Sequence, residues 1–250
     1  RHKLKFNQSY KVWLDNFEYL SSYYADYVKR HISHNILYVG WELPPSLCRY
    51  FRDHSIQFMS IGVSPIRLLD DYDIYLVTNI EKSYGLQWEA YFKCKRNIFL
   101  KSSIFDSIEL SEYPHSDVYI LGQLPLDSAS ISGGRFCGLS DVVSGFKIKE
   151  YLLVSHPHSK VFGKDIIKAD RLSYKILKFN QNSKIYTFSS SLQYESLMFD
   201  NKNKVEALHD YYKVYREIAD FQFIDVHGLG DFIGSNHSAG SIRNILNVRW

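Results

Sequence analysis

The sequence predicts an α/β protein whose strands form parallel sheets covered by helices on both faces. Two observations favour this class. The composition is that of an ordinary globular protein, with 45% hydrophobic and 23% charged residues. In the second half of the chain, short apolar runs alternate with segments of helical periodicity, as βα units do. A chain of 250 residues is long enough for one large domain or two small ones.

In the first half we expect helices and strands in alternation. A helix is predicted over 9–31, because apolar residues recur there at spacings of three and four: Trp13, Phe17, Leu20, Tyr24 and Tyr27. The apolar runs 36–40 and 56–61 predict buried strands. Between them, Pro44-Pro45 opens a helix that ends near His54, since proline is tolerated in a first helical turn. The run 72–77 fits either a strand or a helix, and we favour a helix.

A polar stretch that contains a proline, 111–116, is the preferred boundary between two halves. We therefore expect an N-terminal half over 1–115 and a C-terminal half over 116–250. In the second half, strands are predicted over 118–122, 151–154 and 184–188, and helices over 164–177 and 204–221.

Charge and composition exclude several classes of protein. The net charge of +3 is too small to make nucleic acid the expected partner. No apolar run approaches the roughly 20 residues that cross a bilayer, and no secretory leader is visible. The three cysteines, Cys48, Cys94 and Cys137, lack metal-ligand spacing and indicate a reducing compartment. The chain starts at Arg1 and not at methionine, so one module of a larger protein is an open possibility.

Three predicted strand ends carry polar residues of the kind that bind ligands. In an open parallel sheet, ligands bind at the carboxyl ends of the strands. The first end carries Gln123, Asp127 and Ser128. The other two hold these residues: His156, Pro157, His158 and Lys160 in one, and Ser189, Ser190, Ser191 and Glu195 in the other. If the three strands are neighbours, these residues meet in space.

Each end offers a different chemistry, and each has a structural alternative. Serine hydroxyls before a helix can hold a phosphate or carboxylate, but they equally cap helices. His156, held out of α-geometry by the following proline, can face an anion, although a His-Pro pair is also ordinary turn punctuation. Asp127 can act as a nucleophile or base, or simply cap the residues after it. His227, Asp231 and His237 match no standard metal spacing, and we interpret them as surface residues.

The chain resembles the bacterial retaining β-Kdo glycosyltransferases of the WbbB type, which build O-antigen and capsule polysaccharides (Kdo is 3-deoxy-D-manno-oct-2-ulosonic acid). The similarity spans residues 42–191. It rests on Glu42-Leu43-Pro44-Pro45-Ser46-Leu47, Ser64-Pro65-Ile66-Arg67, Thr78-Asn79, Gly122-Gln123 with Asp127-Ser128, Ser155-His156-Pro157 and Ser189-Ser190-Ser191. The His-Pro and serine motifs are shared with sialyltransferases, so they indicate a CMP-sugar donor. The segment around Gln123 and Asp127 is more specific to the Kdo enzymes.

This resemblance implies two Rossmann-like halves of the GT-B kind, with the active site in the cleft between them. Asp127 matches the family's nucleophile, and His156 would contact the CMP phosphate or the sugar carboxylate. The implied reaction is a double displacement with retention, with no metal and no cofactor. The residues expected to bind the donor are Gln123, Ser128, Pro157, His158, Lys160, Ser189, Ser190, Ser191 and Glu195. Glu42 and Arg67 are the candidates for acceptor binding, and a structural ion pair is an equal alternative for either.

The partners implied are CMP-Kdo and a glycan or glycolipid acceptor, with at most peripheral membrane contact. We expect a cytoplasmic location, at the inner face of the bacterial inner membrane. Two alternatives stay open: an inverting transferase for another CMP-activated acidic sugar, and a carbohydrate- or nucleotide-binding module without catalysis. Against the sialyltransferases, Asp70-Asp71 is followed by tyrosine and not by the glycine of their base motif.

Overall fold

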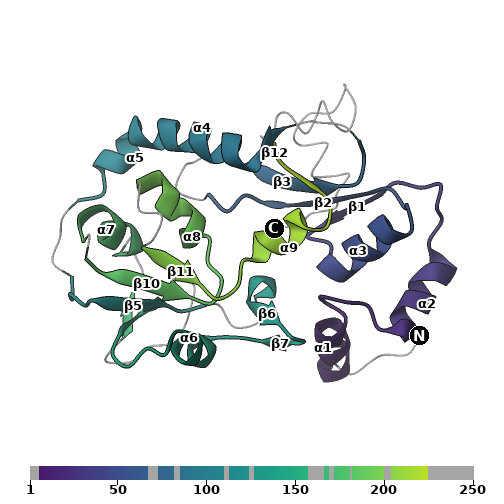
Figure 1. Ribbon diagram of the computed structural model, residues 1–250, viewed down its shortest axis with the longest axis horizontal. Coiled ribbons are helices and arrows are strands. Elements are labelled where there is room, and N and C mark those ends of the chain that lie inside the picture. Colours follow the sequence, from purple (N-terminus) through teal and green to yellow (C-terminus); the bar gives the residue numbers. More distant parts are fainter. Residues whose placement is uncertain are drawn as a thin grey trace.

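The computed structural model is a mixed α/β protein built around two five-stranded sheets (Figure 1). It describes residues 6–66, 73–81, 85–109, 113–123, 127–156, 166–168, 172–180, 182–199 and 204–224, with the backbone alone at 6–10 and 166–168. The α/β class predicted from the sequence is confirmed at this level. A short hairpin of β6 (Ile131–Ser132) and β7 (Arg135–Phe136) lies apart from both sheets.

The first sheet has the strand order β1-β2-β3-β12-β4. Its strands are β1 (Tyr38–Trp41), β2 (Phe58–Val63), β3 (Ile74–Thr78), β12 (Asp220–Ile224) and β4 (Leu86–Gln87). Only β1 and β2 pair in parallel; the pairings β2–β3, β3–β12 and β12–β4 are antiparallel. The expectation of parallel pairing is therefore wrong for most of this sheet.

The second sheet has the order β11-β10-β5-β8-β9 and is parallel at every described pairing. Its strands are β11 (Val205–Ala207), β10 (Lys184–Thr187), β5 (Val118–Leu121), β8 (Leu152–Ser155) and β9 (Ile166–Lys168). Parallel strands place all their carboxyl ends at one edge of the sheet. This edge is where the polar residues predicted to bind a ligand should lie.

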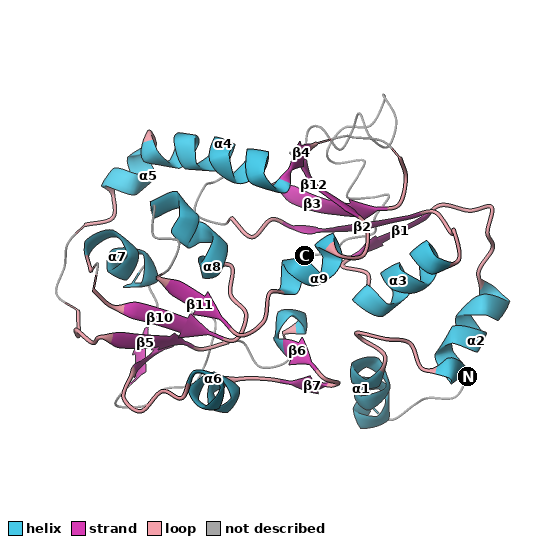
Figure 2. Ribbon diagram, viewed as in Figure 1, coloured by secondary structure: helices cyan, strands magenta, loops and turns pink. Residues whose placement is uncertain are grey.

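Helices cover both sheets (Figure 2). On the first sheet, side chains of α3 (Pro45–Asp53), α4 (Trp88–Leu100) and α9 (Tyr211–Arg216) share one hydrophobic cluster with β2, β3 and β12. On the second sheet, α7 (Leu172–Phe179) and α8 (Leu192–Glu195) pack on one face and α6 (Leu139–Phe146) on the other. The remaining described elements are α1 (Phe6–Asp15), α2 (Ser22–His31), α5 (Ser103–Asp106), η1 (Ser128–Ser130) and η2 (Ser196–Phe199).

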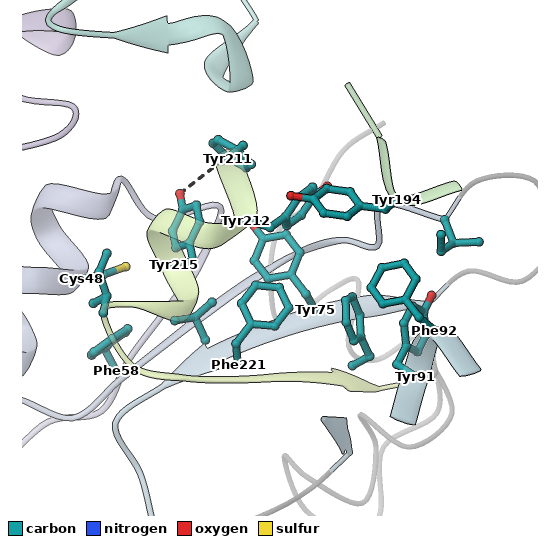
Figure 3. Close-up of a cluster of buried hydrophobic side chains, with 14 of the residues drawn as sticks. Cys48, Phe58, Tyr75, Tyr91, Phe92, Tyr194, Tyr211, Tyr212, Tyr215 and Phe221 are labelled. Atoms are coloured by element: carbon teal, nitrogen blue, oxygen red, sulfur yellow. Dashed lines mark hydrogen bonds between the residues drawn. The ribbon is translucent and has the colours of Figure 1, made fainter. Parts of the chain in front are cut away.

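A tyrosine-rich core joins the two sheets (Figure 3). Tyr75 of β3 and Tyr215 of α9 are fully buried in it, and Tyr194 of α8 reaches it from the second sheet. The ring of Tyr75 also explains why residue 62 is a glycine, because a Cβ at Gly62 would lie 2.4 Å from the ring carbons Cε1 and Cζ of Tyr75. Since such a contact is far inside van der Waals range, the packing of β2 against this tyrosine requires glycine there.

Several predicted elements differ from the structure. The run 72–77 is largely strand β3, since a fully buried strand is apolar throughout and lacks the period-two signal. The segment 164–177 contains strand β9 before helix α7. The helix predicted over 9–31 is broken after Asp15, where the Asn16 side chain accepts a hydrogen bond from the Ser21 backbone at 2.8 Å.

The last described segment corrects the division into halves. The predicted helix 204–221 is instead β11, α9 and the start of β12, and β12 pairs with β3 in the first sheet. The expected C-terminal half, 116–250, is therefore too long, because the chain returns to the first sheet by residue 220. The change from the first sheet to the second, between α5 and β5, falls close to the boundary predicted near residue 115.

Candidate functional site

The order of the second sheet brings the three predicted strand ends together. β5 lies between β10 and β8, and both pairings are parallel. The ladder continues past β5, where the Gly122 backbone N–H donates to the Val154 carbonyl at 2.8 Å. Gln123, His156 and Ser189 therefore follow neighbouring strands at one sheet edge.

Two buried polar atoms at this edge have no hydrogen-bond partner among the described residues: Nε2 of Gln123 and Oγ1 of Thr187. Thr187 is the last residue of β10 and is completely buried. Buried donors are nearly always satisfied in native proteins, so these two atoms on neighbouring strands leave hydrogen bonds for a water molecule or a ligand to make. Thr187 is a candidate that the sequence analysis missed, because its position at a strand end becomes informative only once the sheet order is known.

Asp127 caps the short helix η1. Its Oδ1 accepts a hydrogen bond from the Ala129 backbone at 3.0 Å, and its carbonyl accepts from the Ser130 hydroxyl at 2.7 Å. Asp127 therefore acts as a helix cap, which is the structural alternative to a role as nucleophile or base. The cap fixes the direction of a half-buried carboxylate whose other oxygen, Oδ2, is not used in that bond.

Ser128 connects this aspartate to the tyrosine core. The Ser128 side chain lies near the hydroxyl of Tyr211 and opposes the rise in the pKa of Tyr211 that burial causes. The Tyr211 hydroxyl lies 3.2 Å from that of Tyr215, which donates to the Leu43 carbonyl at 2.9 Å (Figure 3). The hydroxyls of Tyr211 and Tyr215 therefore lead from the neighbourhood of Ser128 to Leu43, the residue that follows Glu42.

The charge of Glu42 acts on these hydroxyls. Burial raises the pKa of Tyr211, and the negative charge of Glu42 raises it further. Glu42 follows β1 and has a positive φ of 45°, a left-handed conformation that non-glycine residues rarely adopt. Its N–H donates to the Ile61 carbonyl at 2.7 Å, which holds it in place. Glu42 and Ser128, the residue after Asp127, thus both influence the pKa of Tyr211.

The serine triplet shows the features of a helix start. The Ser190 hydroxyl accepts a hydrogen bond from the Leu192 backbone at 3.2 Å, and Ser191 precedes the first residue of α8. Ser189 is buried, with 4% of its surface exposed. Glu195 is also buried and accepts a hydrogen bond from the Tyr174 hydroxyl at 3.1 Å, the setting of a structural carboxylate.

His209 is a second residue that the sequence analysis missed. It follows β11, the next strand of the same sheet, and its N–H donates to the Phe188 carbonyl at 2.8 Å. Its half-buried ring stacks on Phe188, and burial lowers its pKa, against the opposing effects of Glu18 and Asp210. The alternation of strand and helix could have revealed it, but the prediction of one helix over 204–221 concealed the strand end.

Four predicted site residues lie outside the described residues: Arg67, Pro157, His158 and Lys160. The same holds for His227, Asp231 and His237. Within the described part of the chain, no group of three or more histidine, cysteine or acidic residues is arranged to hold a metal ion. Within that part, no helix is both long and apolar enough to cross a membrane.

No protein-family model matches this chain, and no curated protein matches it.

Proposed function

We propose that this chain is a glycosyltransferase that moves Kdo from CMP-β-Kdo to a glycan acceptor with retention, in the synthesis of bacterial surface polysaccharide such as the O-antigen of lipopolysaccharide or capsule. The observation that carries the proposal is the carboxyl edge of the second sheet. There Gln123, His156 and Ser189 follow adjacent parallel strands beside buried donors without a partner. The proposal includes two Rossmann-like lobes of the GT-B kind; the parallel second sheet supports it, and the antiparallel pairings of the first sheet depart from it.

The donor sugar nucleotide fits the chemistry of this edge. CMP-Kdo carries a phosphate and a carboxylate, both of which need hydrogen-bond donors. Gln123 Nε2, Thr187 Oγ1 and the Ser189 hydroxyl are donors that water reaches poorly. Donors preorganised in a buried site stabilise the negative charge that develops on the departing phosphate. No metal is required in this scheme, and the absence of a cofactor remains a prediction.

In the proposed reaction Asp127 attacks the anomeric carbon of Kdo. The bond from that carbon to the phosphate oxygen breaks, CMP leaves as the anion, and a glycosyl ester forms on the aspartate. An acceptor hydroxyl then attacks the same carbon, the ester bond breaks, and the hydroxyl proton passes to a base on the acceptor side. Two inversions at one carbon give overall retention, and a carboxylate close to the anomeric centre stabilises the oxocarbenium-like transition states.

In this proposal, residues next to the first sheet bind the acceptor. Glu42 is the described candidate, and its carboxylate lies near the hydroxyls that lead to Ser128. Arg67 is the second candidate, from the sequence alone. CMP-Kdo and a glycan or glycolipid acceptor are the proposed partners, and the inner face of the bacterial inner membrane is the proposed location.

The test of the nucleophile uses Asp127→Asn. An asparagine oxygen can still accept the hydrogen bond from Ala129, so the cap survives while the nucleophilic charge is lost. We expect transfer from CMP-Kdo to fall at least about a thousandfold, as for loss of an essential nucleophile, with melting temperature and CMP affinity unchanged. Asp127→Ala, which also loses the cap, is the matched comparison for stability. Near-normal turnover of Asp127→Asn would disprove the assignment.

The cap of η1 specifically favours the second candidate function, a binding module in which Asp127 is purely structural. Calorimetry with CMP and an assay for transfer or slow donor hydrolysis separate the two. Binding of CMP without either reaction would support the module, while no binding of CMP would contradict both. For an active protein, NMR of the product anomer distinguishes retention from the inverting alternative.

A further inference from the structure

Large apolar side chains are exposed unevenly over the surface. Of the twelve exposed ones among the described residues, six lie within the 21-residue segment 19–39. They are Tyr19, Tyr23, Tyr27, Ile36, Leu37 and Val39, with between 39% and 68% of their surface exposed. Single exposed apolar residues are normal, but six of them within one short segment distinguish it from the rest of the described surface. We call the segment 19–39, which contains helix α2, the aromatic surface.

Helix α2 presents two distinct faces. Val28 and the C-cap residue Ile32 pack against the core cluster. Tyr23, Tyr27 and Arg30, at spacings of four and three, lie together on the opposite face. No residue of α2 is buried, and the helix lies at one end of the molecule, coloured dark purple in Figure 1. The outward face therefore carries aromatic rings with a cation beside them, and nothing in the described chain covers it.

The charges of this surface favour a negatively charged occupant. Between residues 19 and 39 the acidic residue is Asp26, whereas Lys29 and Arg30 are exposed bases in the last turn of α2. Arg49 of α3 adds a third cation, with its guanidinium carbon 4.6 Å above the centre of the Tyr19 ring. Tyrosine rings, aliphatic side chains and interleaved cations are the composition of segments that lie in the interface of an anionic bilayer.

The tyrosines of α9 are not available to a lipid surface. Within 202–216, Tyr211, Tyr212 and Tyr215 are buried in the core that joins the sheets. We propose that the aromatic surface of α2 and the following segment docks the protein on an anionic membrane surface. The tyrosines and Ile36, Leu37 and Val39 enter the headgroup region, and Lys29, Arg30 and Arg49 pair with lipid phosphates. This inference stands independently of the proposed reaction.

The test is co-sedimentation of the chain with vesicles of phosphatidylcholine, with and without 30 mol% phosphatidylglycerol, roughly the anionic content at which surface charge attracts basic segments. We expect binding to the anionic vesicles only, and weaker binding as salt increases. Lys29→Glu with Arg30→Glu should weaken it about tenfold or more, because each cation near such a surface contributes to affinity. Tyr23→Ser with Tyr27→Ser should weaken it similarly.

Ile98→Ser with Leu100→Ser on α4 is the matched control, because these residues are as exposed as Tyr27 and lie outside the aromatic surface. This variant should bind like the parent chain, and thermal melting confirms that every variant folds. Binding that is absent, equal for neutral vesicles, or unchanged in both test variants would overturn the proposal. So would light scattering that shows a dimer which the tyrosine variant converts to monomer, since the occupant would then be a second copy. The assay contains no sugar nucleotide, so its failure leaves the proposed transferase untouched.

Discussion

The hydroxyl of Tyr211 links a candidate of the proposed donor site, Ser128, to the candidate for acceptor binding, Glu42, because both influence its pKa. It forms a hydrogen bond with the hydroxyl of Tyr215 and lies near Ser128, the residue after the proposed nucleophile, and the charge of Glu42 also acts on it. The ring itself is part of the buried core. Because the ring and the hydroxyl have separable roles, a phenylalanine at this position removes the link and keeps the packing.

Tyr211→Phe should therefore act as a positioning variant. We expect kcat to fall about five- to tenfold, the value of one well-placed hydrogen bond, with the KM for CMP-Kdo unchanged. Tyr212→Phe is the matched control on the same helix, because its hydroxyl donates to the Val63 carbonyl and not to Ser128. Equal losses of kcat in the two variants, or a loss that follows the melting temperature alone, would contradict the role of Tyr211.

Lys204 predicts how stability depends on pH. Only 6% of this residue is exposed, its Nζ has no hydrogen-bond partner among the described residues, and burial lowers its pKa to about 8. The unfolded chain, with a lysine pKa of about 10.4, binds more protons than the folded chain between these values. Stability should therefore rise with pH from about 8 to 10.4, and the cost of burying the charge is fully present below pH 8.

Lys204→Met removes the buried charge and retains the apolar stem. The variant should be more stable than the parent chain by about 1–2 kcal/mol at pH 7, and this advantage should shrink by pH 10. Urea denaturation at the two pH values measures both effects. If the parent and the variant showed the same pH dependence, Lys204 would not be the titrating group.

At the level of secondary structure, sequence predicted best those elements whose ends are chemically marked. The helix opened by Pro44-Pro45 is α3, and the runs that end at Gly122, Ser155 and the serine triplet are β5, β8 and β10. Proline fixes a helical start, while glycine and serine end a buried strand, so these signals are local. The same local signals placed the polar strand ends correctly before the strand order was known.

The elements and site residues that the sequence did not predict share a physical cause. In 204–221, apolar residues at spacings of three and four fit a helix, yet they belong to two strands and a short helix that cross between the sheets. Their burial is set by contacts with both sheets, which periodicity within one segment does not report. For the site, the unpaired donors of Gln123 and Thr187 depend on which strands are neighbours, so they could not be predicted from the sequence. His209 was missed because the prediction of one helix over 204–221 concealed the end of β11.

The path of the chain makes the two sheets dependent on each other. β12 lies between β3 and β4 in the first sheet, but the chain reaches it only after it has completed β11 of the second sheet. Asp210 stabilises the segment that crosses from β11 to β12. It caps α9, accepts a hydrogen bond from the Tyr194 hydroxyl, and forms an ion pair with Arg216 at 3.0 Å. The Arg216 guanidinium in turn lies 4.0 Å from the centre of the Trp88 ring on α4. These contacts hold α8, α9 and α4 together between the two sheets.

We therefore expect the two sheets to unfold as one cooperative unit. In native-state hydrogen exchange, the slowest amides of β12 and of β5 should open with free energies that agree within about 1 kcal/mol, because Tyr194 and Met198, which follow the second sheet's β10, are part of the core that packs on the first sheet. Arg216→Ala should lower both values together, since the crossing serves both lobes, whereas Lys184→Ala, which removes an exposed ion pair with Glu206, should change neither by more than about 0.5 kcal/mol. Amides of β5 that open well before those of β12 would show that the second sheet unfolds by itself, and the shared tyrosine core would then not be what joins the lobes.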